Sequence, residues 1–74
     1  MADIVHAPIS IIVNGDTRTV RAGETLAGLV VTLNLQPERL AIELDRRIVK
    51  RAEWPSAVLS AGAKIEIVQF VGGG

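Results

Sequence analysis

The sequence predicts an α+β domain, in which a mixed sheet of four to five strands is covered on one face by a single helix. Two observations carry this prediction. Apolar residues alternate with period two in several short runs, and one stretch between these runs has the helical period instead. The predicted order is strand, strand, helix, strand, strand, strand. A chain of 74 residues has room for one such domain, which we place at residues 9–71, between a flexible leader (1–8) and a flexible glycine tail (72–74).

The first two strands form a predicted hairpin. Residues 9–13 alternate, with Ile9, Ile11 and Val13 on one face, and Asn14-Gly15 is a strong signal for a two-residue turn. Residues 16–21 are the β-rich return strand. Proline has no N–H to donate to a ladder, so we expect the leader to end at Pro8.

The single helix follows the hairpin. Thr25 offers a side-chain oxygen at the N-cap position, and Asn34 is a plausible C-terminal cap. Between them, apolar residues recur at the spacing i, i+3, i+4, i+7, which places four side chains on one face of a helix: Leu26, Leu29, Val30 and Leu33. This face is predicted to cover the sheet.

The second half of the chain supplies the remaining strands. Residues 40–44 and 48–50 flank a turn at Asp45-Arg46-Arg47, in which Asp45 is the expected left-handed residue if one is needed. Residues 51–59 have no sustained period, so Trp54-Pro55 is predicted to be extended or a single irregular turn, with Trp54 as a partly buried anchor. The last strand, 64–70, is too apolar for an exposed edge. We therefore expect it to lie centrally, beside the first strand.

Composition excludes several classes of function. The chain has no cysteine and one histidine, His6, which lies in the predicted leader. No serine stands in a motif such as G-x-S-x-G, and no spacing of ligands indicates a metal site. The formal net charge is zero, so no overall field attracts nucleic acid or an anionic membrane, and no apolar run is long enough to span a bilayer. The one basic cluster, Arg46, Arg47, Lys50 and Arg51, is expected to be a solvated face, with a docking patch for an acidic partner as the alternative. We expect a cytoplasmic protein that is not an enzyme and binds no cofactor.

The reactive group is expected at the glycine tail. Glycine has no Cβ, so Gly72-Gly73-Gly74 can enter a slot too narrow for other residues, and the carboxylate of Gly74 is the one chemical group that the tail offers. Phe70 and Val71 stand at the root of the tail. Strand alternation places one of them outward, which suggests a contact surface for a partner, although burial of both is the alternative.

The sequence is similar to the ubiquitin-like β-grasp sulfur carriers, and it resembles the carrier of thiamin biosynthesis more closely. The resemblance runs from about Ile9 to Gly74. Its most specific part is the block 62–74, which ends in Val71-Gly72-Gly73-Gly74. Four weaker parts support it: Ile11-Ile12-Val13-Asn14-Gly15, Thr25-Leu26, Ala41-Ile42-Glu43-Leu44 with Ile48-Val49, and Arg51-Ala52-Glu53-Trp54.

The resemblance implies a function for the tail. A partner adenylyltransferase, resembling the ubiquitin-activating enzymes, spends MgATP to make the acyl-adenylate of Gly74. A sulfur donor such as a cysteine desulfurase then supplies sulfur, which gives a Gly74 thiocarboxylate for thiazole synthase. Gly72, Gly73, Phe70 and Val71 are the implied contacts with these partners. The chain itself is implied to be a carrier, and the catalytic groups belong to the partners.

Two other functions stay open on the sequence. The small subunit of molybdopterin synthase shares this chemistry with another acceptor, although it usually has a different residue before its Gly-Gly. A ubiquitin-like binding module or protein modifier is the third class. The sequence also departs from the carriers at one hairpin, where Asp45-Arg46-Arg47 stands in place of the frequent Asn-Gly, and Lys50 in place of a frequent proline.

Overall fold

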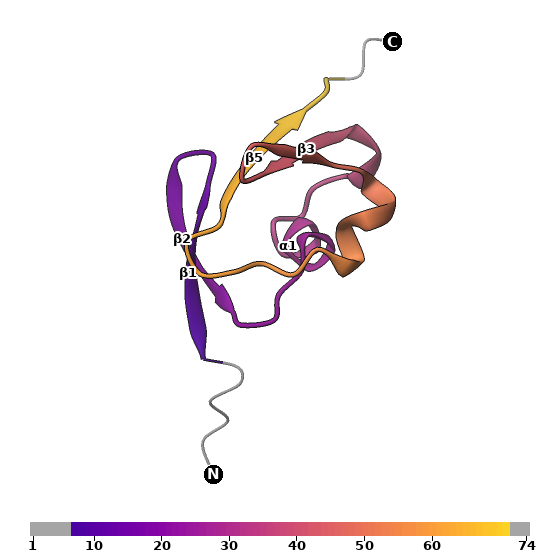
Figure 1. Ribbon diagram of the computed structural model, residues 1–74. Coiled ribbons are helices and arrows are strands. Elements are labelled where there is room, and N and C mark those ends of the chain that lie inside the picture. The colour runs from indigo at the N-terminus through magenta and orange to yellow at the C-terminus, as the bar shows by residue number, and fades with distance from the viewer. Residues whose placement is uncertain (1–6, 72–74) are drawn as a thin grey trace.

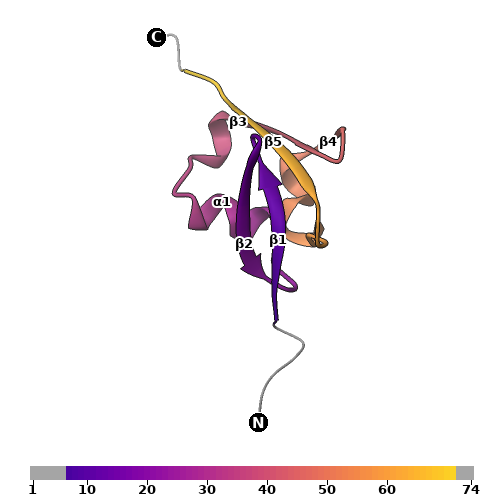
Figure 2. The same ribbon diagram turned by 90° about the vertical axis from the view of Figure 1, so that its left-hand side faces the viewer.

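A computed structural model describes residues 7–71 of the chain. Within this range, the strands form one sheet in the order β2-β1-β5-β3-β4, and one α-helix lies against a single face of it (Figure 1). Figure 2, turned by 90°, shows β1 and β2 in front of α1. The α+β prediction is confirmed. The elements are β1 (Pro8–Val13), β2 (Asp16–Arg21), α1 (Leu26–Thr32), β3 (Leu40–Leu44), β4 (Arg47–Val49) and β5 (Lys64–Gln69), with the 3-10 helices η2 (Pro37–Arg39) and η3 (Arg51–Ser56).

The hairpin of β1 and β2 turns at Asn14-Gly15, as predicted. The φ angles are 49° and 85°, and positive values at both central residues are those that a type I′ turn requires. Because the carbonyl of Ala7 accepts the N–H of Ala22 at 3.1 Å, the nitrogen of Pro8 faces away from β2.

The predicted end of the leader is therefore wrong, since Pro8 already belongs to β1. A proline whose nitrogen points away from the neighbouring strand costs no ladder hydrogen bond with it. Residues 1–6 lie outside the described range.

The helix begins and ends where the sequence predicts. The Thr25 hydroxyl oxygen accepts the N–H of Gly28 at 3.1 Å, so Thr25 is the N-cap. Asn34, just beyond the last turn, has a φ of 58°, which is the left-handed conformation that often terminates helices. Of the four residues on the predicted apolar face, Leu26, Leu29 and Val30 are buried and Leu33 is partly buried.

The turn between β3 and β4 uses two left-handed residues. Asp45 has a φ of 51°, as predicted, and Arg46 has a φ of 72°. Asp45 donates its N–H to the Lys64 carbonyl at 2.8 Å, and its Oδ1 accepts the Lys64 N–H at 2.9 Å. The turn is thus fastened to the start of β5, which explains why an aspartate occupies a strained position.

The segment after β4 is a 3-10 helix, η3, and not the extended or irregular turn that the sequence predicted. Its central residue, Trp54, is only 3% exposed, and its indole N–H donates to the Val49 carbonyl at 2.9 Å. Trp54 therefore anchors η3 to the end of β4. The expected anchoring role of Trp54 is confirmed, with deeper burial than predicted.

The core lies between α1 and the inner face of the sheet. Strand β5 is central, as predicted: it runs parallel to β1 and antiparallel to β3. Its inner residue Ile65 has no exposed surface. The buried apolar residues come from most parts of the fold and are aliphatic except for one: Ile11, Val13, Leu26, Leu29, Val30, Ile42, Trp54, Leu59, Ala63 and Ile65.

Candidate functional site

The end of β5 is the point where the chain leaves the sheet. The N–H of Phe70 donates to the Arg39 carbonyl at 2.7 Å, one residue beyond the strand. Pairing with the antiparallel neighbour β3 reaches Gln69, and the bond to Arg39, the residue before β3, holds the chain as far as Phe70. Val71 follows with 94% of its surface exposed.

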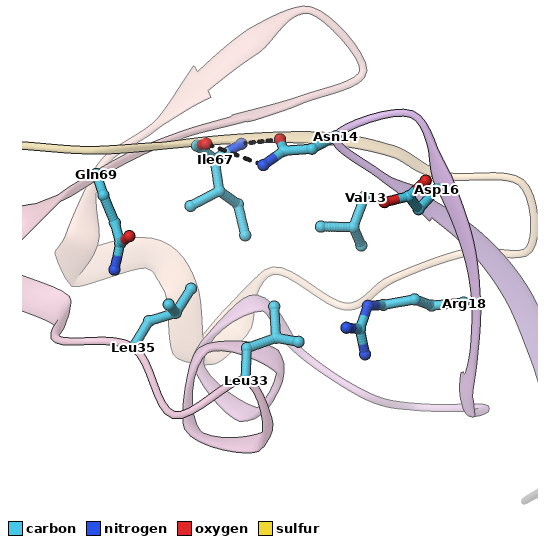
Figure 3. Close-up of a pocket in the computed structure, with 8 residues that line it drawn as sticks. All are labelled: Val13, Asn14, Asp16, Arg18, Leu33, Leu35, Ile67 and Gln69. Carbon is cyan, nitrogen blue, oxygen red and sulfur yellow. Dashed lines mark hydrogen bonds between the residues drawn. The ribbon is translucent and has the colours of Figure 1, made fainter.

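On its other side, β5 is held by a side chain. β1 pairs with β5 at Val13↔Ile65 and then turns away. The side chain of Asn14 continues the ladder: its Oδ1 accepts the Ile67 N–H at 2.7 Å, and its Nδ2 donates to the Ile67 carbonyl at 3.2 Å (Figure 3). We call these two bonds the Asn14 latch. The latch replaces a missing backbone partner two residues before Gln69, where β5 ends.

A shallow cleft of about 330 Å³ lies beside the latch, between the β1–β2 hairpin and the segment that follows α1. Figure 3 shows the Arg18 guanidinium and the Gln69 amide facing it from opposite sides, with Leu33 and Leu35 below. Its lining contains no histidine, serine or cysteine. Asp16 is the one carboxylate in this lining, and no histidine, serine or cysteine stands beside it to form a catalytic pair.

Exposed apolar side chains gather on the face of the sheet that α1 does not cover, which we call the open face, and at the end of β5. Phe70 is 57% exposed and Val68 55% exposed, and Ile48 on β4 is 75% exposed. Val68 lies on β5 two residues before Phe70, and successive odd or even residues of a strand share a face. Strand alternation predicted that one of Phe70 and Val71 is outward; both are exposed, so the alternative that both are buried is wrong.

The structure tests only part of the predicted site. Phe70 and Val71 lie at the end of the described range, whereas Gly72, Gly73 and the predicted reactive residue Gly74 lie outside it. Among residues 7–71, no three His, Cys, Asp or Glu side chains are grouped so that they would hold a metal ion. No helix in that part of the chain is long and apolar enough to cross a membrane.

Two parts of the site were not predicted from the sequence. The Asn14 latch joins residues 53 positions apart, and nothing in the local sequence indicates this pairing. Exposure of Ile48 and Val68 was also missed. The alternation of β3 with Ile42 inward, together with the antiparallel pairing of β3 and β4, would have placed Ile48 on the open face.

The described residues define a β-grasp domain, in which a mixed five-stranded sheet is covered by one helix and its central last strand leads into a glycine-rich end. A family model, the ThiS family, matches residues 11–74. A solved structure of a thiamine biosynthesis protein (ThiS) from Geobacter metallireducens is similar, with a TM-score of 0.77 and 26% identity, covering 89% of this chain and all of that chain.

Two curated relatives are longer proteins. A thiazole synthase of Magnetococcus marinus is 39% identical over 61 residues, which are 82% of this chain and 19% of the relative. A thiazole synthase of Paramagnetospirillum magneticum is 30% identical over 66 residues, which are 89% of this chain and 20% of the relative. This chain thus spans about a fifth of the length of these relatives.

The chain belongs to the ThiS family. This membership confirms the resemblance to the ubiquitin-like sulfur carriers of thiamin biosynthesis, and the shared architecture confirms the β-grasp fold.

Proposed function

We propose that this chain carries sulfur for thiazole formation in thiamin biosynthesis, as a thiocarboxylate on Gly74. One observation carries the proposal: the ThiS family model matches through Gly74 and therefore includes all three glycines. The exposed strand end supports it, because Phe70 and Val71 present apolar surface to a partner directly before those glycines.

The proposed chemistry needs activation, because the oxide of a carboxylate is a poor leaving group. A carboxylate oxygen of Gly74 attacks the α-phosphorus of MgATP in a partner adenylyltransferase, and pyrophosphate leaves. Hydrosulfide from a sulfur donor then attacks the acyl carbon, and AMP departs with the former carboxylate oxygen. The products are AMP and a Gly74 thiocarboxylate. No group of the described domain enters either step, so the chain acts as a co-substrate and not as an enzyme.

The proposed acceptor of the sulfur is a thiazole synthase. Two relatives with that name each contain a segment similar to this chain within a longer polypeptide. Proteins that act together are often found joined in one chain elsewhere, which supports direct contact between this domain and a thiazole synthase. A cysteine desulfurase is the proposed origin of the sulfur, and a thiol reductant releases it from the persulfide of that enzyme as hydrosulfide.

Intact-mass spectrometry tests the carrier function. The chain is incubated with MgATP, a candidate adenylyltransferase and sulfide, and the expected result is the mass gain for replacement of one oxygen by sulfur. A chain lacking Gly74 is expected to keep the fold, because that residue lies beyond the last ladder bond at Phe70, and to show no mass gain.

A second variant tests whether the glycines enter a narrow slot. Gly73→Val adds a Cβ and two methyl groups three residues after Phe70, which makes the last backbone hydrogen bond of β5, so we expect folding to be unchanged and modification to be lost. Val31→Ala is the matched control, since it shortens a valine that is 77% exposed on α1, away from the strand end that is proposed to contact the partner. Modification of the Gly73→Val chain at the wild-type rate would contradict the narrow slot, and an unmodified wild-type chain beside an active control carrier would contradict the carrier function.

A further inference from the structure

Backbone hydrogen bonds hold the end of β5 from one side only. The N–H of Phe70 donates to the Arg39 carbonyl at 2.7 Å, and in an antiparallel pair every second residue bonds to the neighbouring strand. The even-numbered residues of β5 therefore bond toward β3, and the odd-numbered residues turn their N–H and C=O groups toward β1. Among the strands that the structure describes, β1 pairs with β5 no further than Val13↔Ile65. The odd-numbered residues after Ile65 thus have no strand neighbour on this side.

The side chain of Asn14 takes the place of that neighbour at Ile67. One amide group accepts the Ile67 N–H at 2.7 Å and donates to the Ile67 carbonyl at 3.2 Å (Figure 3). The backbone that carries this side chain is itself fixed, because the N–H of Asn14 donates to the Ile65 carbonyl at 2.9 Å and its φ of 49° belongs to the hairpin turn. An asparagine amide offers both a donor and an acceptor, whereas an ionised aspartate offers acceptors alone.

The Asn14 latch lies close to the residues that lead into the glycines. In the described part of the chain, Ile67 on the β1 side and Phe70 on the β3 side are the last residues of this segment that hydrogen bonds hold. Val71 comes next and the three glycines follow it in the sequence. Without the latch, the chain beyond Ile65 would be bonded to its β3 side alone and could move away from the hairpin.

We propose that Asn14 is a positioning residue for the adenylation of Gly74, because the latch holds the end of β5 in the extended conformation that the adenylyltransferase receives. This inference rests on the proposed carrier function and adds a residue to it. A segment that is ordered before binding loses less conformational entropy when it binds. Ordering one further backbone residue on binding lowers affinity about 5- to 30-fold. The latch therefore acts on how tightly the chain is bound and not on the reaction of the bound chain.

Asn14→Gly is the variant that tests this role. It removes both bonds to Ile67 and leaves the hairpin turn in place, since glycine adopts positive φ without strain. If one more residue then has to be ordered on binding, the KM for the chain in adenylation should rise about 5- to 30-fold. The kcat should stay within about twofold of the wild-type value, because a change in KM alone marks an interaction that acts equally on the bound state and the transition state.

Two control variants separate positioning from loss of stability. Thr25→Ala removes the acceptor for the Gly28 N–H at the start of α1, so it destabilises the domain without changing a hydrogen bond of β5. Asn34→Gly makes the same replacement at another positive φ, 58°. We expect both controls to have the wild-type KM, because a residue that only stabilises the fold changes the folded fraction and not the affinity of the folded chain.

The experiment measures ATP–pyrophosphate exchange by the adenylyltransferase with MgATP and increasing concentrations of each full-length variant. The folded fraction at the assay temperature is measured by circular dichroism, and chain concentrations are corrected for it. Amide hydrogen exchange at Ile67 is measured on each free chain. We expect faster exchange at Ile67 and a raised KM in Asn14→Gly, and neither change in the two controls.

The outcomes separate this inference from the carrier function. A KM of Asn14→Gly equal to that of Thr25→Ala would show that the latch only stabilises the fold, and the inference would be wrong while the carrier function stands. A raised KM with wild-type exchange at Ile67 would assign the effect to direct contact between Asn14 and the partner, which also contradicts the inference. A wild-type chain that supports no pyrophosphate exchange, beside an active control carrier, would contradict the carrier function, and the inference would fall with it.

Discussion

Replacement of Asn14 by glycine measures how much the Asn14 latch stabilises the end of β5. Asn14 has a φ of 49°, so most other residues would add backbone strain to the loss of the side chain. Glycine adopts positive φ without strain, and Gly-Gly is an accepted type I′ turn. Asn14→Gly therefore leaves the hairpin turn in place and removes the two hydrogen bonds to Ile67.

The expected loss follows from those two bonds. A typical intramolecular hydrogen bond contributes about 0.5–1.5 kcal/mol net, and the Asn14 bonds to Ile67 are 2.7 Å and 3.2 Å long. The free energy of unfolding should fall by about 1–3 kcal/mol. A domain of this length has a total of only about 4–11 kcal/mol, so the melting temperature should drop by roughly 5–20 °C.

Chemical denaturation and amide hydrogen exchange are the assays. Asn34→Gly is a matched control, because Asn34 also has a positive φ, 58°, at an exposed position. This variant measures how the replacement of asparagine by glycine acts through the backbone alone. We expect its free energy of unfolding to differ from that of the wild type by no more than about 0.5 kcal/mol. In Asn14→Gly, exchange at the Ile67 amide should accelerate more than at the Phe70 amide, which is bonded to Arg39 on the other side of β5.

One result would refute this reasoning. If Asn14→Gly and Asn34→Gly lowered the free energy of unfolding equally, and the Ile67 amide exchanged as in the wild type, the latch would contribute nothing. The end of β5 would then be held by β3 alone.

Three further substitutions test local features. Thr25→Ala removes the acceptor for the Gly28 N–H and should cost about 0.5–2 kcal/mol of unfolding free energy in thermal denaturation; Thr25→Ser should restore most of it. Arg46→Gly relieves the left-handed φ of 72° and should stabilise the domain by about 0.5–1 kcal/mol, and a loss of stability would show that the arginine side chain has a compensating contact. Trp54→Phe leaves the Val49 carbonyl without its indole donor, and a decrease of about 1–3 kcal/mol in urea denaturation is expected, whereas an unchanged midpoint would assign the role of Trp54 to packing alone.

Features set by local backbone conformation were predictable from the sequence. The turn at Asn14-Gly15 and the helix ends at Thr25 and Asn34 depend only on the backbone angles of a few adjacent residues. Each of these residues forms the turn or cap that its type predicts. The central place of β5 was predictable for another reason. The strand is too apolar to lie at an exposed edge of the sheet, so it needs a neighbouring strand on each side. Pro8 was misassigned because its effect depends on which side its nitrogen faces, and this is known only once the register is known.

Features that depend on register were not predictable. The pairing of Glu43 with Glu66 and the bonds from Asn14 to Ile67 join positions far apart in the chain. Local sequence gives the period of a strand but not its partner. Of the candidate site, the exposure of Phe70 and Val71 is established, whereas the role of Gly74 stays a prediction because the described residues end before it.

The central position of β5 has a mechanical consequence. Any protein that grips the glycine end and pulls transmits the force to β5, which is bonded to β1 on one side and to β3 on the other. Ladder hydrogen bonds run across the strands, so a pull along β5 strains many of them in shear at the same time and does not open them one by one. A strand at the edge of the sheet would peel away under far less force. Strand order thus lets a partner hold the chain by its end without unravelling the domain.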